Sequence, residues 1–297
     1  MTQKESLNSV EIAVLGIVRS FHDIKIPVYK GLKDWCTHFN TSLYVVTGES
    51  GNSIHNQLLP CGNQTFMLNE NHLAEQREIK DKKLASFFSS RQNRVNRIAM
   101  IRDNLRSYFR SLQNTPDAII VVDLDLLKIP SSASLSHAVH RILAGNSGVI
   151  CANGIERFMG IFHIEYDVFA MGISVDPWKQ RRLYKDIMAT IPYLYRTPLE
   201  SCFGGLAVYD PKLYLEKSCN YYSAERVDDK CEHQSLHECL REQYPTFDIG
   251  ILGTLKTYRE FDATILNAVL FLLGILLLLG VLCRRRKRMT NNRKRQE

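Results

Sequence analysis

The chain has 297 residues, of which 45% are hydrophobic and 23% are charged, so it is long enough to form one large globular domain or two small ones. Its formal net charge of +7 would point to a nucleic-acid-binding surface if the basic residues were spread over the fold. Instead, residues 284–297 contain eight basic residues and one acidic residue, which accounts for the whole excess. The rest of the chain is neutral, and this argues against nucleic acid as a partner.

Apolar runs and helical periodicity predict the first elements of an α/β sheet. Residues 11–18 and 43–48 are short apolar runs typical of buried strands, and no GxGxxG motif follows the first of them. Residues 96–112 form a predicted helix, because apolar side chains recur there at helical spacing. These side chains are Ile98, Ile101, Leu105, Phe109 and Leu112.

The apolar run at residues 118–122 is followed by two carboxylates, Asp123 and Asp125, and is the most informative segment of the chain. It is short enough to be a buried strand. If that strand ends at or just after Asp123, both carboxylates emerge at its carboxyl end, where ligands bind in open α/β sheets. Two such oxygen ligands could hold Mg²⁺ or Mn²⁺ together with the phosphates of a nucleotide. The alternative is that Asp-x-Asp only forms a turn here.

The remaining predicted elements continue the alternation of strands and helices. Gly204 and Gly205 would allow the backbone of another segment to approach closely, or would simply permit a tight entry into a strand. The alternation implies an α/β sandwich with the Asp pair near its middle. Strands are predicted at 148–152, 166–170, 203–209 and 250–253, and helices at 131–144, 177–188 and 231–243.

An uncharged segment at residues 263–283 consists mostly of Leu, Ile and Val. As a helix it would span roughly 31 Å, which matches the hydrocarbon core of a bilayer. We therefore predict a single transmembrane helix there, with a buried helix of a soluble fold as the alternative. The predicted organisation is a polar N-terminus at 1–9, a globular domain at 10–256, a linker at 257–262, the transmembrane helix at 263–283 and a basic tail at 284–297.

Sequence signals disagree about which side of the membrane carries the globular domain. The basic run at 284–288 should remain in the cytosol by the positive-inside rule, which places the domain on the opposite side. No signal peptide is recognisable, which favours tail-first insertion and a cytosolic domain. Asn40 and Asn63 begin N-glycosylation triplets and favour a lumenal domain. Eight dispersed cysteines permit disulfides without requiring them, so they do not decide on which side of the membrane the globular domain lies.

Six segments, taken in order, resemble GT-A-fold glycosyltransferases and are most similar to the capsule-associated α-1,3-mannosyltransferase-like family. The resemblance covers residues 10–255 and rests on the order and spacing of the segments, since no single motif is specific. The segments are 97–102, Asp123-Leu124-Asp125, Cys151-Ala152-Asn153-Gly154, 166–170, Phe203-Gly204-Gly205-Leu206 and Cys231-Glu232-His233.

That resemblance implies a GT-A-like, Rossmann-like sandwich that binds a UDP- or GDP-linked sugar with Mn²⁺ or Mg²⁺. Together with the predicted transmembrane helix, it implies a membrane-anchored hexosyltransferase of the Golgi or ER, with mannose as one candidate sugar, that acts on a glycan or glycoconjugate acceptor. The mannosyltransferase resemblance favours retention of the anomeric configuration over inversion. Two alternatives belong to other classes: a metal-dependent nucleotidyl- or phosphotransferase that shares the Asp pair, and a catalytically inactive membrane-tethered protein with the same fold.

The resemblance also assigns roles to single residues on the donor side. Asp123 and Asp125 would bind the metal, with Asp125 the better placed and Asp123 directed towards the ribose or the ion. Arg102 would face the nucleotide phosphates, although Asp103 follows it where the family commonly has Asn. Asn153 would line the sugar or acceptor side of the bound donor.

The later segments would supply the chemistry of transfer. Glu232 and Asp167 are candidate general bases for the acceptor hydroxyl, because an inverting transferase needs a carboxylate there. His233 would join the metal, and Tyr166 would line the acceptor side.

Simpler interpretations of these residues stay open. Arg102 would be an ordinary solvated charge on its helix, and residues 166–167 would form a capping turn. His237 would be an ordinary surface histidine. A structural zinc site is a further alternative, since four potential ligands lie close in sequence. They are Cys231, His233, His237 and Cys239.

Overall fold

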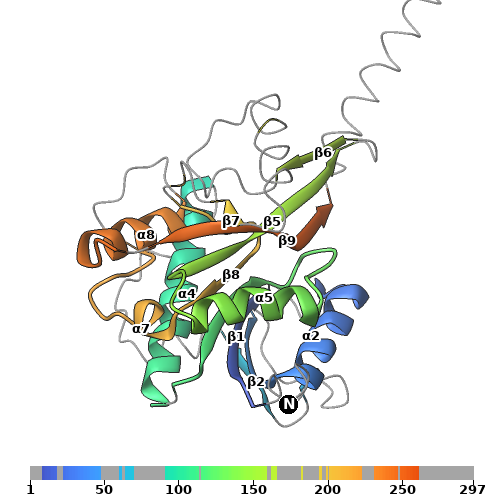
Figure 1. Ribbon diagram of the computed structural model, residues 1–297, viewed down its shortest axis with the longest axis horizontal. Coiled ribbons are helices and arrows are strands. Elements are labelled where there is room, and N and C mark those ends of the chain that lie inside the picture. The colour runs from blue at the N-terminus through green and yellow to red at the C-terminus, as the bar shows by residue number, and fades with distance from the viewer. Residues whose placement is uncertain are drawn as a thin grey trace, which may run out of the picture.

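Strands and helices alternate along the chain, and the computed structural model assembles them into one mixed sheet with helices on both faces (Figure 1). The α/β sandwich predicted from the sequence is therefore confirmed. The structure describes residues 9–18, 23–47, 60–61, 64–69, 91–113, 115–158, 162–165, 182, 194–195, 199, 201–222, 231–246 and 248–260.

Several predicted features lie outside the described residues. They are the strand at 166–170, the helix at 177–188 apart from Arg182, the transmembrane helix at 263–283 and the basic tail at 284–297. Within the described ranges, no helix combines the length and the apolar character that crossing a bilayer requires.

The first half of the sheet is parallel and has the strand order β3-β2-β1-β4. Its strands are β1 (Glu11–Val18), β2 (Asn40–Thr47), β3 (Thr65–Asn69) and β4 (Ala118–Asp123). The chain moves outward from β1 to β3 and then returns to the other side of β1 to form β4. This order is that of a doubly wound nucleotide-binding fold, in which ligands bind where the order reverses. Here that point is at the carboxyl ends of β1 and β4.

The second half of the sheet is mixed. It contains β5 (Val149–Phe158), β6 (Phe162–Glu165), β7 (Leu194–Tyr195), β8 (Leu206–Tyr209) and β9 (Ile249–Glu260). β8 runs antiparallel between β4 and β5, and β9 pairs in parallel with β5. The last strand is longer than predicted, because its pairing with β5 continues to Glu260. Residues 257–260, which were expected in the linker, therefore belong to the sheet.

In the described part of the chain, five helices cover the sheet. They are α2 (Ile26–His38), α4 (Arg91–Ser111), α5 (Ser132–Leu143), α7 (Pro211–Tyr214) and α8 (Glu232–Gln243). Side chains of a strand alternate between its two sides, so the strands contribute side chains to two separate hydrophobic cores. Ile120 and Val122 of β4 pack with α2 and α5, on what we call the α2/α5 face. Ile119 and Val121 pack with α4, α7 and α8, on the α4/α8 face.

The helices predicted at 96–112, 131–144 and 231–243 are confirmed with shifted ends. α5 begins after Ser131, whose hydroxyl accepts a hydrogen bond from the Ser134 amide at 3.4 Å, as a helix N-cap should. α4 buries Leu105 and Phe109, whereas Leu112 lies beyond the end of the helix and is 40% exposed. α2 is not among the predicted elements, although its buried side chains follow helical spacing. They are Val28, Leu32 and Trp35.

Six of the described cysteines form three disulfides. Cys36–Cys61 joins α2 to the segment before β3, and Cys151–Cys202 joins β5 to the segment before β8. Cys219–Cys239 joins the segment after α7 to α8. The paired cysteines are 20 to 51 residues apart in the chain. Loops of this length correspond to a stabilisation of about 3 to 4 kcal/mol per disulfide.

Candidate active site

The end of β4 brings Asp123 to the point where the strand order reverses. Asp123 is the last residue of the strand and lies opposite Ile17 of β1. Val121 faces α4 and α8, so the alternation along the strand directs the side chain of Asp123 to the same face. The carboxylate therefore stands at the carboxyl edge of the central strands, as the sequence predicted.

Leu124 fixes the backbone between the two carboxylates. Its side chain is 0% exposed and packs on the α2/α5 face against Gly16 of β1. A Cβ at Gly16 would lie 2.6 Å from Leu124 Cδ1, so only glycine leaves room for this contact. The Leu124 amide also donates to the Ile17 carbonyl at 3.1 Å. Asp123 and the exposed Asp125 thus lie on either side of an anchored residue.

Arg102 of α4 is the central residue of the site. It is only 2% exposed, so the alternative of a solvated helix charge is wrong. Its Nη2 donates to Asp123 Oδ1 at 2.7 Å, and its Nε lies 3.4 Å from Glu232 Oε1. Its guanidinium also stacks over the ring of Phe203, 4.8 Å from the ring centroid. Arg102 therefore joins the end of β4 to the start of α8.

The charges of this cluster depend on one another. Burial alone would lower the pKa of Arg102, but the carboxylates of Asp123 and Glu232 raise it above its ordinary value. Burial, opposed by the nearby charge of Arg102 and assisted by Asp125 and Glu232, raises the pKa of Asp123 to about 6. A divalent cation beside Asp123 would favour its charged form.

Glu232 and His233 open α8 beside this cluster. Glu232 is the first residue of the helix, where a carboxylate interacts favourably with the helix dipole, and its Oε2 accepts a 3.1 Å hydrogen bond from the Cys231 thiol. His233 is fully buried, with its ring stacked on Phe203 at a centroid distance of 3.8 Å. Its Nε2 lies 3.8 Å from Glu232 Oε1. Glu232 therefore contacts Arg102 directly, whereas His233 is connected to Arg102 through the ring of Phe203.

The turn at Gly204 and Gly205 joins this cluster to Asn153. Gly204 has φ +61°, and a Cβ there would lie 2.3 Å from the Ala152 carbonyl oxygen, so the turn requires glycine. Gly205 accepts a hydrogen bond from the Asp123 amide at 3.0 Å. Asn153 is buried and follows a register shift in β5. The predicted close backbone approach is confirmed, and it holds Asn153 near the end of β4.

The donor set at the Asp pair fits Mg²⁺ or Mn²⁺, because carboxylate oxygens are the ligands that these ions prefer. No group of three or more His, Cys, Asp or Glu side chains converges on a common point in the part of the chain that the structure describes. One or two carboxylates are sufficient when the phosphates of a substrate complete the shell of Mg²⁺. The role of His233 as a metal ligand stays a prediction.

Two interpretations of the α8 region are wrong. His237 is not a surface histidine, since it is 0% exposed and bonded through Nδ1 to the Ser201 hydroxyl at 2.8 Å. Burial lowers the pKa of His237 to about 3. The zinc alternative fails because Cys239 is disulfide-bonded to Cys219. Asp167, the other candidate base, and Tyr166 lie outside the described residues.

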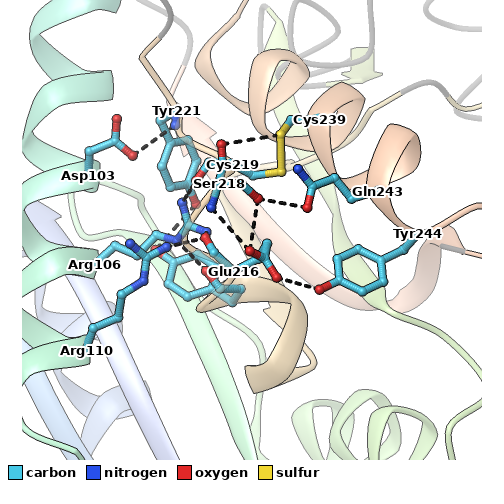
Figure 2. Close-up of a disulfide and its surroundings, with 11 residues drawn as sticks. Asp103, Arg106, Arg110, Glu216, Ser218, Cys219, Tyr221, Cys239, Gln243 and Tyr244 are labelled. Carbon is cyan, nitrogen blue, oxygen red and sulfur yellow. Dashed lines mark hydrogen bonds between the residues drawn. A yellow bond between two sulfur atoms is a disulfide. The ribbon is translucent and has the colours of Figure 1, made fainter.

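Two α4 residues that carried no predicted role hold the segment after α7 in place. Arg106 is 0% exposed and donates to the carbonyl oxygens of Tyr214, Glu216 and Cys219. Asp103 accepts hydrogen bonds of 2.9 Å from the amides of Tyr221 and Tyr222. Figure 2 shows both side chains of α4 directed at the segment that carries these partners. Asp103 thus has a structural role, since it holds the backbone of this segment.

The segment held by α4 is also tied to α8. Besides the Cys219–Cys239 disulfide, the Glu216 carboxylate accepts hydrogen bonds from the Tyr244 hydroxyl at 2.5 Å and from the Ser218 hydroxyl at 2.9 Å (Figure 2). These bonds hold the pKa of Glu216 at about 2. Tyr221 follows in the same segment and packs edge-on against His233, at a centroid distance of 5.2 Å. The segment thereby supports the start of α8.

No protein-family model and no curated protein matches this chain. Among solved structures, S. aureus TarS 1-349 in complex with UDP is similar at 11% identity with a TM-score of 0.47, over 86% of this chain and 61% of that chain. A mannosyltransferase, PcManGT from Pyrobaculum calidifontis in complex with GDP-Man and Mn²⁺, is similar at 11% identity with a TM-score of 0.45, over 84% of this chain and 56% of that chain.

Glucosyl-3-phosphoglycerate synthase from Mycobacterium tuberculosis, in complex with Mn²⁺, UDP and phosphoglyceric acid, is similar at 10% identity with a TM-score of 0.46. That match covers 89% of this chain and 76% of the synthase. The chain spans less than two thirds of the TarS and PcManGT structures. At these identities and TM-scores the similarity decides neither family nor substrate.

Proposed function

We propose that the chain is a metal-dependent glycosyltransferase of the GT-A type that transfers a hexose from a nucleotide-sugar donor. The observation that carries this proposal is the meeting of Arg102, Asp123 and Glu232 at the reversal point of the strand order. These groups suit a diphosphate-linked sugar: an arginine, two carboxylates after a central strand and a third carboxylate at a helix start. The uncharged segment at 263–283 would anchor the enzyme to an endomembrane.

The donor diphosphate would lie between Arg102 and the Asp pair. Arg102 Nη1 is buried and has no hydrogen-bond partner among the described residues, so one donor of the guanidinium is available to a phosphate oxygen. A Mg²⁺ or Mn²⁺ ion held by Asp123 and Asp125 would neutralise charge on the leaving diphosphate. Asn153, at the other side of the glycine turn, would bind the sugar or the ribose.

Glu232 would act on the transferred sugar or on the acceptor. It lies beside Arg102 at the start of α8, and a carboxylate there suits a general base for an acceptor hydroxyl or a group that stabilises positive charge at the reacting carbon. Asp167 is the second candidate for the base. Mannose as the sugar, a glycan or glycoconjugate as the acceptor, and retention as the outcome belong to the same proposal.

The test is a donor screen with the full chain in detergent and Mn²⁺. The first panel contains UDP-GlcNAc, UDP-glucose and GDP-mannose, and released UDP or GDP and free sugar are measured separately. Release of both products supports a glycosyltransferase, because slow transfer of the sugar to water is its expected side reaction. Release of a sugar phosphate instead would support the nucleotidyl- or phosphotransferase alternative.

A binding measurement separates an inactive protein from a wrong site. Asp125→Asn should abolish the Mn²⁺-dependent part of nucleotide-sugar binding measured by calorimetry, while Glu242→Asn, an exposed acidic position on α8, should leave it unchanged. Wild-type binding without turnover of any common donor would favour the non-catalytic alternative. Equal Mn²⁺-dependent binding by Asp125→Asn and the wild type would contradict the metal site.

A further inference from the structure

The three disulfides bear on the compartment in which the domain folds. They lie on both faces of the sheet: Cys36 is on α2, whereas Cys239 is on α8. Cytosolic thiols are kept reduced, and structural disulfides form in secreted proteins and in the lumen of the ER. A domain that is cross-linked throughout in this way fits an oxidising compartment.

The same side of the membrane is where asparagine is glycosylated, and Asn40 is placed to be modified. It begins the triplet Asn40-Thr41-Ser42 and is the first residue of β2, with an exposed side chain. Its Oδ1 accepts a hydrogen bond from Gln64 Nε2 at 3.2 Å. This bond uses the side-chain oxygen, so the amide nitrogen to which a glycan is attached is not occupied by it.

The position of Asn40 also keeps a glycan away from the candidate active site. Asn40 pairs with Glu11 at the amino ends of β2 and β1, whereas Asp123 stands at the carboxyl end of β4. The length of the eight-residue strand β2 separates the two edges by about 23 Å. A bulky, hydrated glycan at this edge would therefore obstruct neither the metal ligands nor Arg102.

We propose that Asn40 is an N-glycosylation site and that the globular domain lies on the lumenal side of an endomembrane. In the modification, Asn40 Nδ2 loses a proton and forms a bond to the anomeric carbon of a lipid-diphosphate-linked oligosaccharide supplied by the host cell. The bond between that carbon and the phosphate breaks, and the lipid diphosphate leaves. The glycosylation of Asn40 does not depend on the proposed activity, because it concerns the opposite edge of the sheet, whereas the membrane on whose lumenal side the domain lies is the one proposed to hold residues 263–283.

The test uses the full chain expressed in a eukaryotic cell that glycosylates secretory proteins. Asn63 lies outside the described residues, so it is replaced by Gln to leave Asn40-Thr41-Ser42 as the single glycosylation triplet. On this background the chain should show the mobility shift of one glycan, which an N-glycan-removing amidase abolishes. Asn40→Gln and Ser42→Ala should each lose the shift, while Ser42→Thr should keep it because Thr also completes the triplet.

The Ser42 pair is the matched control, since both variants change the same partly buried side chain and only one destroys the triplet. Peptide mapping of the same material without reductant should recover Cys36 linked to Cys61. An Asn63→Gln chain without an amidase-sensitive shift would overturn the proposal, whatever the state of its cysteines. A shift that persists in both Asn40→Gln and Ser42→Ala would overturn the assignment of the site.

Discussion

Arg102 Nη2 donates to Asp123 Oδ1 at 2.7 Å, and this contact joins the middle of α4 to the end of β4 across the α4/α8 face. The same guanidinium reaches Glu232 at the start of α8. One buried cation is therefore shared by carboxylates from two elements that are far apart in the chain. The stability of the α4/α8 face and the geometry of the candidate site depend on the same side chain.

Removing that cation should destabilise the fold as well as the site. Arg102→Met leaves two carboxylates without their partner, and breaking a buried ion pair in this way costs about 3 to 5 kcal/mol in the free energy of unfolding. Chemical denaturation measures this loss in the free energy of unfolding. Arg97→Met, an exposed change on the same helix, should alter the free energy by no more than about 0.5 kcal/mol. Similar losses in the two variants would refute a central role for Arg102.

The anchoring of Leu124 predicts the effect of a change in a neighbouring strand. Gly16→Ala places a methyl group 2.6 Å from Leu124 Cδ1, so Leu124 must move and carry the Asp pair with it. We expect a loss of about 1 to 3 kcal/mol in stability, together with weaker Mn²⁺-dependent donor binding. Adding Leu124→Val to Gly16→Ala should restore part of the stability and part of the donor binding.

Gly31→Ala is the control for this prediction. Its Cβ would lie 2.6 Å from Ile129 Cγ1, which is an equally close contact away from the Asp pair. It should destabilise the fold to a similar extent and leave donor binding unchanged in the folded fraction. Equal losses of donor binding in the two variants would mean that Leu124 does not position the carboxylates.

Acid should destabilise the fold through His237. Burial lowers its folded-state pKa from 6.5 to about 3, so between these values the unfolded chain binds a proton that the folded chain does not. The free energy of unfolding should therefore fall as the pH drops below 6.5, by up to about 1.4 kcal/mol per pH unit. Denaturation at pH 7 and pH 5 measures the slope, which His237→Gln should flatten and His137→Gln, at an exposed position, should not.

The Cys219–Cys239 disulfide should matter for the site as well as for stability. Replacing both cysteines by Ala removes the link between α8 and the segment that carries Tyr221. The pair Cys36–Cys61 is the control, because its sequence separation of 25 is close to the separation of 20 here. Both double variants should lose about 3 kcal/mol of stability. Only the loss of Cys219–Cys239 should raise the Kd for the nucleotide sugar, measured at a temperature where both variants are folded.

Much of the site is predictable from sequence because it lies at the ends of strongly patterned elements. An apolar run followed by Asp123 shows where a strand ends, and the carboxyl end of a central strand is where ligands bind. The place of Asp123 needs only local pattern and the general rules of α/β sheets. The role of Glu232, in contrast, is implied only by the resemblance to GT-A glycosyltransferases, which often have a carboxylate at a helix start.

The missed features depend on partners that are distant in sequence. Arg106 has the pattern of a solvated helix charge until the carbonyls that it binds, more than 100 residues later, fold over it. His237 likewise becomes buried only because Ser201 and Tyr209 supply its hydrogen bonds. Disulfide pairing follows from distances between elements, which spacing along the chain does not give.

Leu124 lies between the two carboxylates, and its contact with Gly16 has an evolutionary consequence. The two positions share one small volume, so their sizes should be inversely correlated among related sequences. A relative with Ala in place of Gly16 should carry a smaller apolar residue between its two Asp residues. The middle position of Asp-x-Asp, which contributes no ligand, would then be under selection as strong as that on the carboxylates it separates.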